Sequence, residues 1–232
     1  MKRENTVVDV LGEIYKEIQV GWAITGCFAL YNYDIYYLLP PRPPVLSLVV
    51  ESKELERRFE VLLRDVVKSF DIGLALIVRR DISLEDDPPY PLSNLPVVPI
   101  MDALLDSLEL GWVGKEPVFL STQAFYHFSR SVRDFEELIR RALRYNYTGA
   151  LKLMNLASGL LMELTPYFLW HKVYSLTLKV LGKPVKPSRV RRDVLEDIHF
   201  AITETVLTNG LYEKIIASFT KNLVGRWERT DC

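Results

Sequence analysis

Apolar positions change their spacing along the chain, and this change predicts where strands give way to helices. Residues 22–24, 45–50 and 74–78 are short and nearly continuous apolar runs, which are typical of buried strands. Between the second and third run, residues 53–69 carry apolar side chains at every third or fourth position, which predicts a helix. Two buried strands joined by one helix form a β-α-β unit, or its antiparallel relative if the strand order differs. We therefore expect a small sheet covered by helices.

The same half of the chain holds further predicted elements. Helical spacing predicts an opening helix over residues 6–19 and a compact helix over residues 27–31. Residues 95–98 favour an edge strand, and residues 99–110 predict a helix that has Pro99 in its first turn. These elements surround the predicted strands.

From residue 119 onward the spacing is helical almost without a break. Proline and glycine separate the segments, as expected at helix starts and stops. The predicted helices cover residues 122–129, 132–145, 148–164, 167–181, 188–208 and 211–227. We expect an α+β protein with a small mixed sheet and helices in residues 1–115, followed by an all-helical domain in residues 116–232.

Composition and charge narrow the classes of function. The 29 lysines and arginines nearly balance the 30 aspartates and glutamates, so any nucleic-acid surface must be a local patch. Two cysteines cannot build a disulfide framework or a zinc site of paired cysteines. No apolar run is long enough to span a bilayer, so we expect a soluble, cytoplasmic protein without a membrane partner. Only two glutamines occur, Gln19 and Gln123, a bias that is compatible with a thermophilic source.

One local patch of positive charge is present in the second half. The stretch 183–192 contains no acidic residue, and a basic loop that leads into a helix can bind phosphate groups on a nucleotide or a nucleic acid. A solvated basic hinge is the alternative interpretation. The candidate phosphate-binding residues are Lys183, Lys186, Arg189, Arg191 and Arg192.

The strand, turn and compact helix around residue 26 carry a resemblance to a known family. The segment 23–30 (AITGCFAL) resembles the glycine-rich entry helix of nucleotidyltransferases from abortive-infection toxin-antitoxin systems. The segment 95–105 is similar to a later helix of the same proteins, and a helical C-terminal half also suits them. The resemblance covers about half of the chain, and it implies a nucleotide-binding role for Thr25, Gly26 and Cys27.

The chain departs from this family at the residues that would hold a metal. The resemblance implies two aspartates on the strand after the entry helix, where they would bind Mg²⁺. In this sequence Ser47 and Val49 stand at those positions. Glu51 and Asp81 are the acids that follow the predicted strands, and they are the candidate catalytic residues together with Lys53.

The same strand end has a second interpretation. Asp34, Glu51 and Lys53 follow the order of the carboxylates and lysine in metal-dependent nucleases of the restriction-endonuclease type. In that chemistry the carboxylates hold Mg²⁺ and the lysine orients or deprotonates the attacking water.

The preferred hypothesis is a noncatalytic nucleotidyltransferase-like protein that needs no cofactor. It would bind a nucleotide or a macromolecular partner, in a toxin-antitoxin or regulatory setting. That partner would be a protein, a second copy of the chain, or a nucleic acid bound at the basic patch. The alternative is a Mg²⁺-dependent nucleotidyltransferase or nuclease that acts on nucleic acid.

Overall fold

A three-stranded mixed sheet lies at one end of a helix-rich α+β fold in the computed structural model, which describes residues 6–33, 45–128, 135–164 and 168–205. The strands are β1 (Trp22–Ile24), β2 (Val45–Val50) and β3 (Gly73–Val78), in that spatial order. β1 is antiparallel to β2, and β2 is parallel to β3. The predicted β-α-β unit is therefore confirmed in its parallel form.

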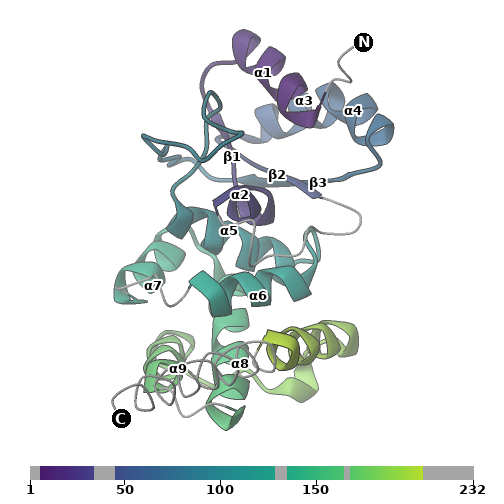
Figure 1. The fold of residues 1–232 in the computed structure, drawn as a ribbon. Coiled ribbons are helices and arrows are strands. Elements are labelled where there is room, and N and C mark those ends of the chain that lie inside the picture. The colour runs from purple at the N-terminus through teal and green to yellow at the C-terminus, as the bar shows by residue number, and fades with distance from the viewer. Residues whose placement is uncertain (1–5, 34–44, 129–134, 165–167, 206–232) are drawn as a thin grey trace, which may run out of the picture.

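The strands lie at the apolar runs from which they were predicted. Such continuous apolar runs suit this sheet because helices cover both of its faces. All six residues of β2 are buried. In Figure 1, α1 (Val7–Glu17), α3 (Lys53–Leu62) and α4 (Arg64–Ser69) lie on one face of the sheet. The other face carries α2 (Gly26–Tyr33) and α5 (Ile100–Trp112). The predicted edge strand at residues 95–98 is reduced to a single parallel bridge between Val97 and Ile24.

Helices make up the rest of the described chain. They are α6 (Val118–Phe128), α7 (Phe135–Arg144), α8 (Thr148–Leu164) and α9 (Phe168–Leu181), followed by a 3₁₀ turn (Pro187–Arg189) and a helix over residues 192–205. The prediction that this last helix starts at residue 188 is wrong, because the 3₁₀ turn occupies its first positions. The predicted helix 211–227 lies outside the described residues.

The predicted helix 53–69 is also wrong in one respect, since it divides at Leu63 into α3 and α4. Leu63 has φ −91° and ψ −4°, values that leave the regular helix, and its side chain is fully buried. Both pieces pack on the sheet.

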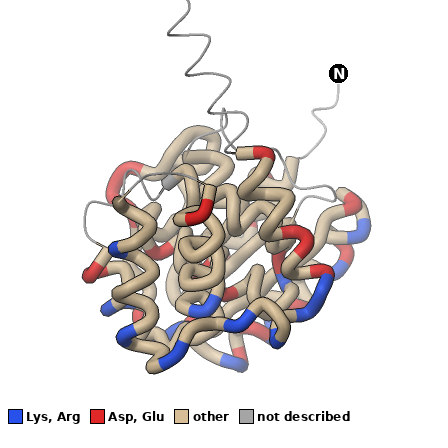
Figure 2. Tube along the Cα trace, turned by 90° about the horizontal axis from the view of Figure 1, so that it is seen from below, with Lys and Arg blue, Asp and Glu red and all other residues tan. Residues whose placement is uncertain are grey.

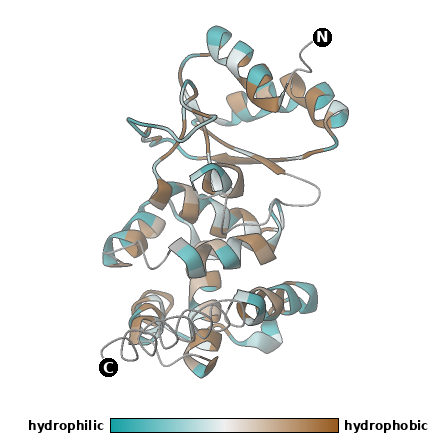
Figure 3. Ribbon diagram, in the orientation of Figure 1, coloured by the Kyte–Doolittle hydropathy of each residue, from teal (hydrophilic) through white to brown (hydrophobic). Residues whose placement is uncertain are grey.

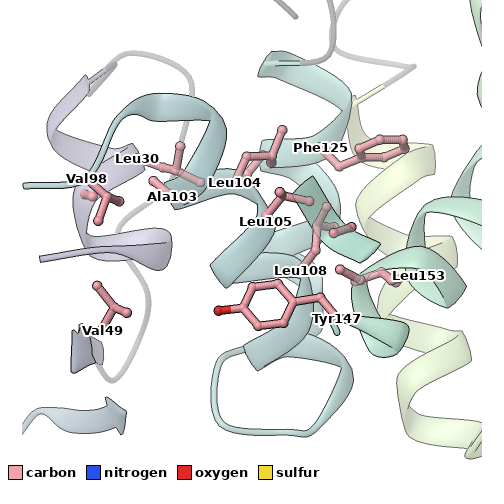
Figure 4. Packing of buried hydrophobic residues seen from close by; sticks show 14 of the residues in the cluster. Leu30, Val49, Val98, Ala103, Leu104, Leu105, Leu108, Phe125, Tyr147 and Leu153 are labelled. Atoms are coloured by element: carbon pink, nitrogen blue, oxygen red, sulfur yellow. The ribbon is translucent and has the colours of Figure 1, made fainter. Parts of the chain in front are cut away.

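One hydrophobic cluster joins the sheet to the helices of the second half, and α5 lies at its centre. Figure 4 shows Ala103, Leu104 and Leu108 of α5 between Leu30 of α2 and Leu153 of α8. The apolar positions of the helices face this cluster in Figure 3. Because the cluster runs from Leu11 to Ile202, the core is continuous across residue 115, and the division into two domains stays a prediction.

The outer edge of β3 has no neighbouring strand in the part of the chain that the structure describes. The Lys115 ammonium donates a hydrogen bond of 2.7 Å to the main-chain carbonyl of Leu76, in the middle of this edge. The same ammonium lies 3.7 Å from a carboxylate oxygen of Glu56 on α3. A side chain therefore fills part of the position that a fourth strand would take.

Among the described residues, no helix combines the length and the apolar character that crossing a bilayer requires.

Candidate functional site

Buried polar side chains gather beneath the sheet, where β1 ends and α2 begins. Thr25 follows β1, and its amide donates to the main-chain carbonyl of Ser47 at 3.0 Å. Its hydroxyl donates to Asp106 on α5 over 2.5 Å. The first turn of α2 is thereby fixed to both the sheet and α5.

A carboxylate from the loop between α5 and α6 occupies the N-terminal end of α2. The Oε1 atom of Glu116 accepts a 3.0 Å hydrogen bond from the amide of Cys27 and a second from the Ser47 hydroxyl. Glu116 is 3% exposed, and its Oε2 atom has no hydrogen-bond partner among the described residues. Burial raises the pKa of Glu116 above its ordinary value, although these hydrogen bonds oppose the increase.

Gly26 makes this arrangement possible. It has a φ of +59°, and a Cβ atom added to it would lie 2.1 Å from Glu116 Oε1 and 2.8 Å from Ser47 Cβ. A residue with a side chain would thus be strained and would also displace the carboxylate.

Small polar side chains extend the cluster away from α2. The sulfur of Cys27 lies 3.0 Å from the Ser107 hydroxyl, which in turn lies 3.1 Å from the Ser121 hydroxyl. The pKa of the Cys27 thiol is raised, chiefly by burial and further by the nearby Glu116 carboxylate. The thiol is therefore a buried neutral group rather than a nucleophile.

A buried ion pair lies on the other side of Thr25. Arg79, the residue after β3, is 4% exposed and donates to Asp106 over 3.0 Å. Asp106 also accepts a 2.7 Å hydrogen bond from the Tyr147 hydroxyl, and the Tyr147 ring in Figure 4 points from the start of α8 back toward the strands. Burial raises the pKa of Asp106 to about 6, while the Arg79 guanidinium opposes the increase.

The guanidinium of Arg79 also lies 4.4 Å from the centre of the Tyr145 ring. Asp102, one turn before Asp106 on α5, accepts hydrogen bonds from Arg141 at 3.0 Å and from the Tyr145 hydroxyl at 3.2 Å. Two acids of one helix face are therefore matched by two arginines and two tyrosines. This pattern is that of a structural network within the fold, in which Arg79 Nε, Arg79 Nη2 and Asp102 Oδ2 have no hydrogen-bond partner among the described residues.

The predicted catalytic residues lie outside this network, on the surface. Glu51 and Asp81 are both exposed, and they follow β2 and β3, whose parallel register brings both strand ends to one edge of the sheet. Asp81 forms a 2.7 Å ion pair with Arg144, and Lys53 forms one of 2.7 Å with Glu56. Asp34 lies outside the described residues.

No group of three histidine, cysteine, aspartate or glutamate side chains within residues 6–33, 45–128, 135–164 and 168–205 is arranged to hold a metal ion. At the strand end, the two acids that the structure describes are the candidate ligands, and Asp81 is engaged by Arg144.

The predicted phosphate-binding residues divide into two sets. Lys183, Lys186 and Arg189 line a hollow of about 310 Å³. Arg191 and Arg192 do not line it, and each is paired on the surface, with Asp193 at 3.1 Å and Glu196 at 2.7 Å respectively.

Two further lining residues were not identified from the sequence. Trp112 comes from the last turn of α5 and Lys152 from the start of α8, and the remaining lining residues are Leu181, Pro184, Val185 and Val190. Lys152 had been interpreted only as a position in the helix over residues 148–164, and Trp112 lies just beyond the predicted helix over residues 99–110. Both lie about 30 residues or more from the basic run, so no local pattern connects them with it. Figure 2, the view from the side of α8 and α9, shows Lys and Arg positions along the lower edge.

Comparison of the chain with models of protein families, with curated proteins and with solved structures gave no match. The functional argument therefore depends on the geometry of the chain itself.

Proposed function

We propose that the chain is a noncatalytic, nucleotidyltransferase-like protein of the cytoplasm that acts by binding a nucleotide or a macromolecular partner, in a toxin-antitoxin or regulatory setting. One observation carries the proposal. The buried carboxylate of Glu116 accepts hydrogen bonds from the amide of Cys27 and the hydroxyl of Ser47. The resemblance would assign the first of these positions to binding phosphate and the second to binding a metal ion.

The electrostatics of this position oppose a phosphate ligand. A triphosphate at the start of α2 would need the Cys27 amide, and it would meet a carboxylate that already accepts from that amide. Mg²⁺ prefers several oxygen ligands with negative charge, whereas β2 offers one hydroxyl at Ser47 and an apolar side chain at Val49. The Cys27 amide and the Ser47 hydroxyl are thus already hydrogen-bonded within the fold.

Thermal unfolding with and without ligands tests the proposal. A ligand that binds only the folded chain raises its melting temperature. We expect nucleotides to raise it to the same extent with and without Mg²⁺ or Mn²⁺. We also expect no transfer of label from any α-³²P-labelled nucleoside triphosphate to RNA or protein. Metal-dependent transfer would refute the proposal.

A second candidate function has one observation in its favour. The parallel register of β2 and β3, which ends with Val50 opposite Val78, places Glu51 and Asp81 at the same edge of the sheet. Two carboxylates at one edge are the minimum for a Mg²⁺-dependent transferase or nuclease. For this function we would expect Mn²⁺ to stabilise the wild type and to lose that effect in both Glu51→Gln and Asp81→Asn.

A further inference from the structure

The hollow between α5, α8 and the loop after α9 combines positive charge with an aromatic surface. Among the residues that the structure describes, four cationic side chains and no acidic one line it, together with the aromatic side chain of Trp112. We propose that this hollow binds one free nucleoside phosphate, with the base against the Trp112 indole and the phosphate between Lys183, Lys186 and Arg189. This inference deepens the proposed function, because it names the ligand and the place where it binds.

The lining chemistry has two parts that match the two parts of such a ligand. Trp112, Leu181, Val185 and Val190 give an apolar surface for a flat ring. Stacking of a base on an aromatic side chain contributes about 1–3 kcal/mol whichever base is bound. The lysines and the arginine give charge-assisted hydrogen bonds to phosphate oxygens.

Lys152 links the two parts. Its ammonium lies 5.8 Å from the centre of the Trp112 ring. The ammonium lies over the ring face, so a base that stacks there takes the place of this flexible cation. When a base stacks on the indole, the Lys152 side chain can turn toward the phosphate.

The position of the Trp112 ring depends on Gly149. A Cβ atom added to Gly149 would lie 2.7 Å from the indole Cδ1 and 2.8 Å from a carboxylate oxygen of Glu109. That oxygen accepts the amide of Ala150 at 2.7 Å, so Glu109 caps α8 and does not line the hollow. The indole is held against the start of α8, and of the four cations Lys152 is close enough to interact electrostatically with Glu109.

The loop that carries the three predicted cations is anchored. The side-chain carbonyl of Asn155 accepts the amide of Val185 at 3.0 Å, and its NH₂ group donates to the Thr177 hydroxyl at 3.1 Å. Pro184 and Pro187 restrict the backbone on either side of Lys186. A preformed loop loses less entropy when it binds, which favours a small ligand.

The size of the hollow favours a single nucleotide over a nucleic acid. Pockets for small ligands and cofactors begin at roughly 300 Å³, and this one has about 310 Å³. Arg191 and Arg192, which would extend the charge beyond it, are paired with acids on their own segment. Of the five cations in the segment 183–192, the three that line the hollow are not paired in this way.

Calorimetric titration of the full chain tests the proposal with defined probes. The probes are AMP, GMP, CMP and UMP, together with adenosine alone and inorganic phosphate alone, at one fixed ionic strength. We expect at least one monophosphate to bind with one-to-one stoichiometry and about tenfold more tightly than either adenosine or phosphate.

Three variants locate the binding. Trp112→Leu keeps an apolar side chain and removes stacking, so it should weaken that nucleotide about tenfold or more and leave phosphate binding unchanged. Arg189→Gln, at an exposed position that does not affect folding, should weaken both ligands about tenfold. Arg192→Gln is the matched control, because it removes the same charge from the same segment outside the hollow and should change binding less than twofold.

Other results would overturn the proposal. These are equal affinity for phosphate and for every nucleotide, equal loss in Arg189→Gln and Arg192→Gln, or binding of single-stranded RNA alone. The proposed function has its own test. Binding as expected, accompanied by metal-dependent transfer, would leave this inference standing and refute the noncatalytic function. If no nucleotide binds but the chain binds RNA or a protein, this inference is refuted and the noncatalytic binding function stands.

Discussion

Glu116 is a buried carboxyl that, in the described part of the chain, has no cation among its hydrogen-bond partners, and this determines how it responds to pH. Its pKa is raised above 4.5, so the folded chain holds its proton to a higher pH than the unfolded chain does. The unfolded chain binds fewer protons in this range. The contribution of Glu116 to the free energy of unfolding therefore falls as pH rises from 4.5 through the folded pKa.

Glu116→Gln keeps an acceptor for Cys27 and Ser47 and cannot ionise. We predict that the stability of this variant relative to the wild type increases between about pH 4.5 and pH 8, as measured by urea unfolding across that range. Glu54→Gln, at an exposed position of α3, is the control and should show almost no such trend. The opposite result would be a free energy of unfolding that increases with pH in the wild type relative to Glu116→Gln. It would mean that the folded site favours the ionised carboxylate.

Comparison of Gly26 with Gly182 distinguishes the two costs of adding a side chain, which are backbone strain and steric clash. Both have positive φ, +59° and +69°, but a Cβ atom on Gly182 would meet nothing within 4 Å. We predict that Gly182→Ala costs about 1 kcal/mol from backbone strain alone, and that Gly26→Ala costs about 2–4 kcal/mol because it also displaces Glu116. Urea unfolding of the two variants measures the difference. Equal costs would show that the Glu116 carboxylate adapts without loss.

At the residue scale, features set by neighbouring residues could be predicted from the sequence, whereas long-range contacts could not. The turn at Thr25 and Gly26 and the apolar nature of β2 were predicted, because local spacing reports them. The hydrogen bond from the Ser47 hydroxyl to Glu116 was not predicted, because the two residues are 69 positions apart and no local pattern marks a single glutamate in a loop. The burial of the Arg79 guanidinium against Asp106 was likewise not predicted, since Arg79 only follows the predicted strand 74–78.

At the scale of elements, Asn155 holds α8, α9 and the following loop together. It is 1% exposed and contacts Val185, Thr177 and the main chain of Tyr174. We predict that Asn155→Ala costs about 1–3 kcal/mol, because buried polar partners lose their hydrogen bonds. Urea unfolding measures this cost, and amide hydrogen exchange at Val185 should become faster.

A matched substitution is Lys179→Ala on the outer side of α9, which should leave both quantities unchanged. If Val185 exchanges at the same rate in Asn155→Ala as in the wild type, the prolines alone hold the loop.

Element types followed from the sequence better than element ends. The helices over residues 148–164 and 168–181 agree with the predicted spacing within a residue. The break at Leu63 was missed, because an apolar residue at the right spacing gives no sign of a change in backbone angles. The hollow was half predicted: its basic loop is visible in the sequence, whereas Trp112 and Lys152 join it only through the packing of α5 on α8.

At the scale of the whole molecule, the continuous core bears on the predicted domain boundary. α5 packs on α2 before residue 115 and on α6 and α8 after it. We predict that Trp22 beside the sheet and Trp170 in the second half lose their folded environments at the same urea concentration. Fluorine NMR of the chain labelled with fluorotryptophan resolves the two signals.

Shortening one buried side chain of α5, the helix that both halves contact, gives the matching test. Leu108→Ala should cost about 2–5 kcal/mol and lower both midpoints together, because the side chain is fully buried between the two halves. Separate midpoints for Trp22 and Trp170 would instead support two domains that unfold independently.

The contact of Lys115 with the edge of β3 also bears on how separate molecules meet. An extended segment of another chain that added to β3 would have to remove the ammonium from the Leu76 carbonyl. It would also have to bury that ammonium or expel it into solvent. A charged side chain at an edge that has no neighbouring strand among the described residues thus opposes amyloid-like stacking of separate molecules.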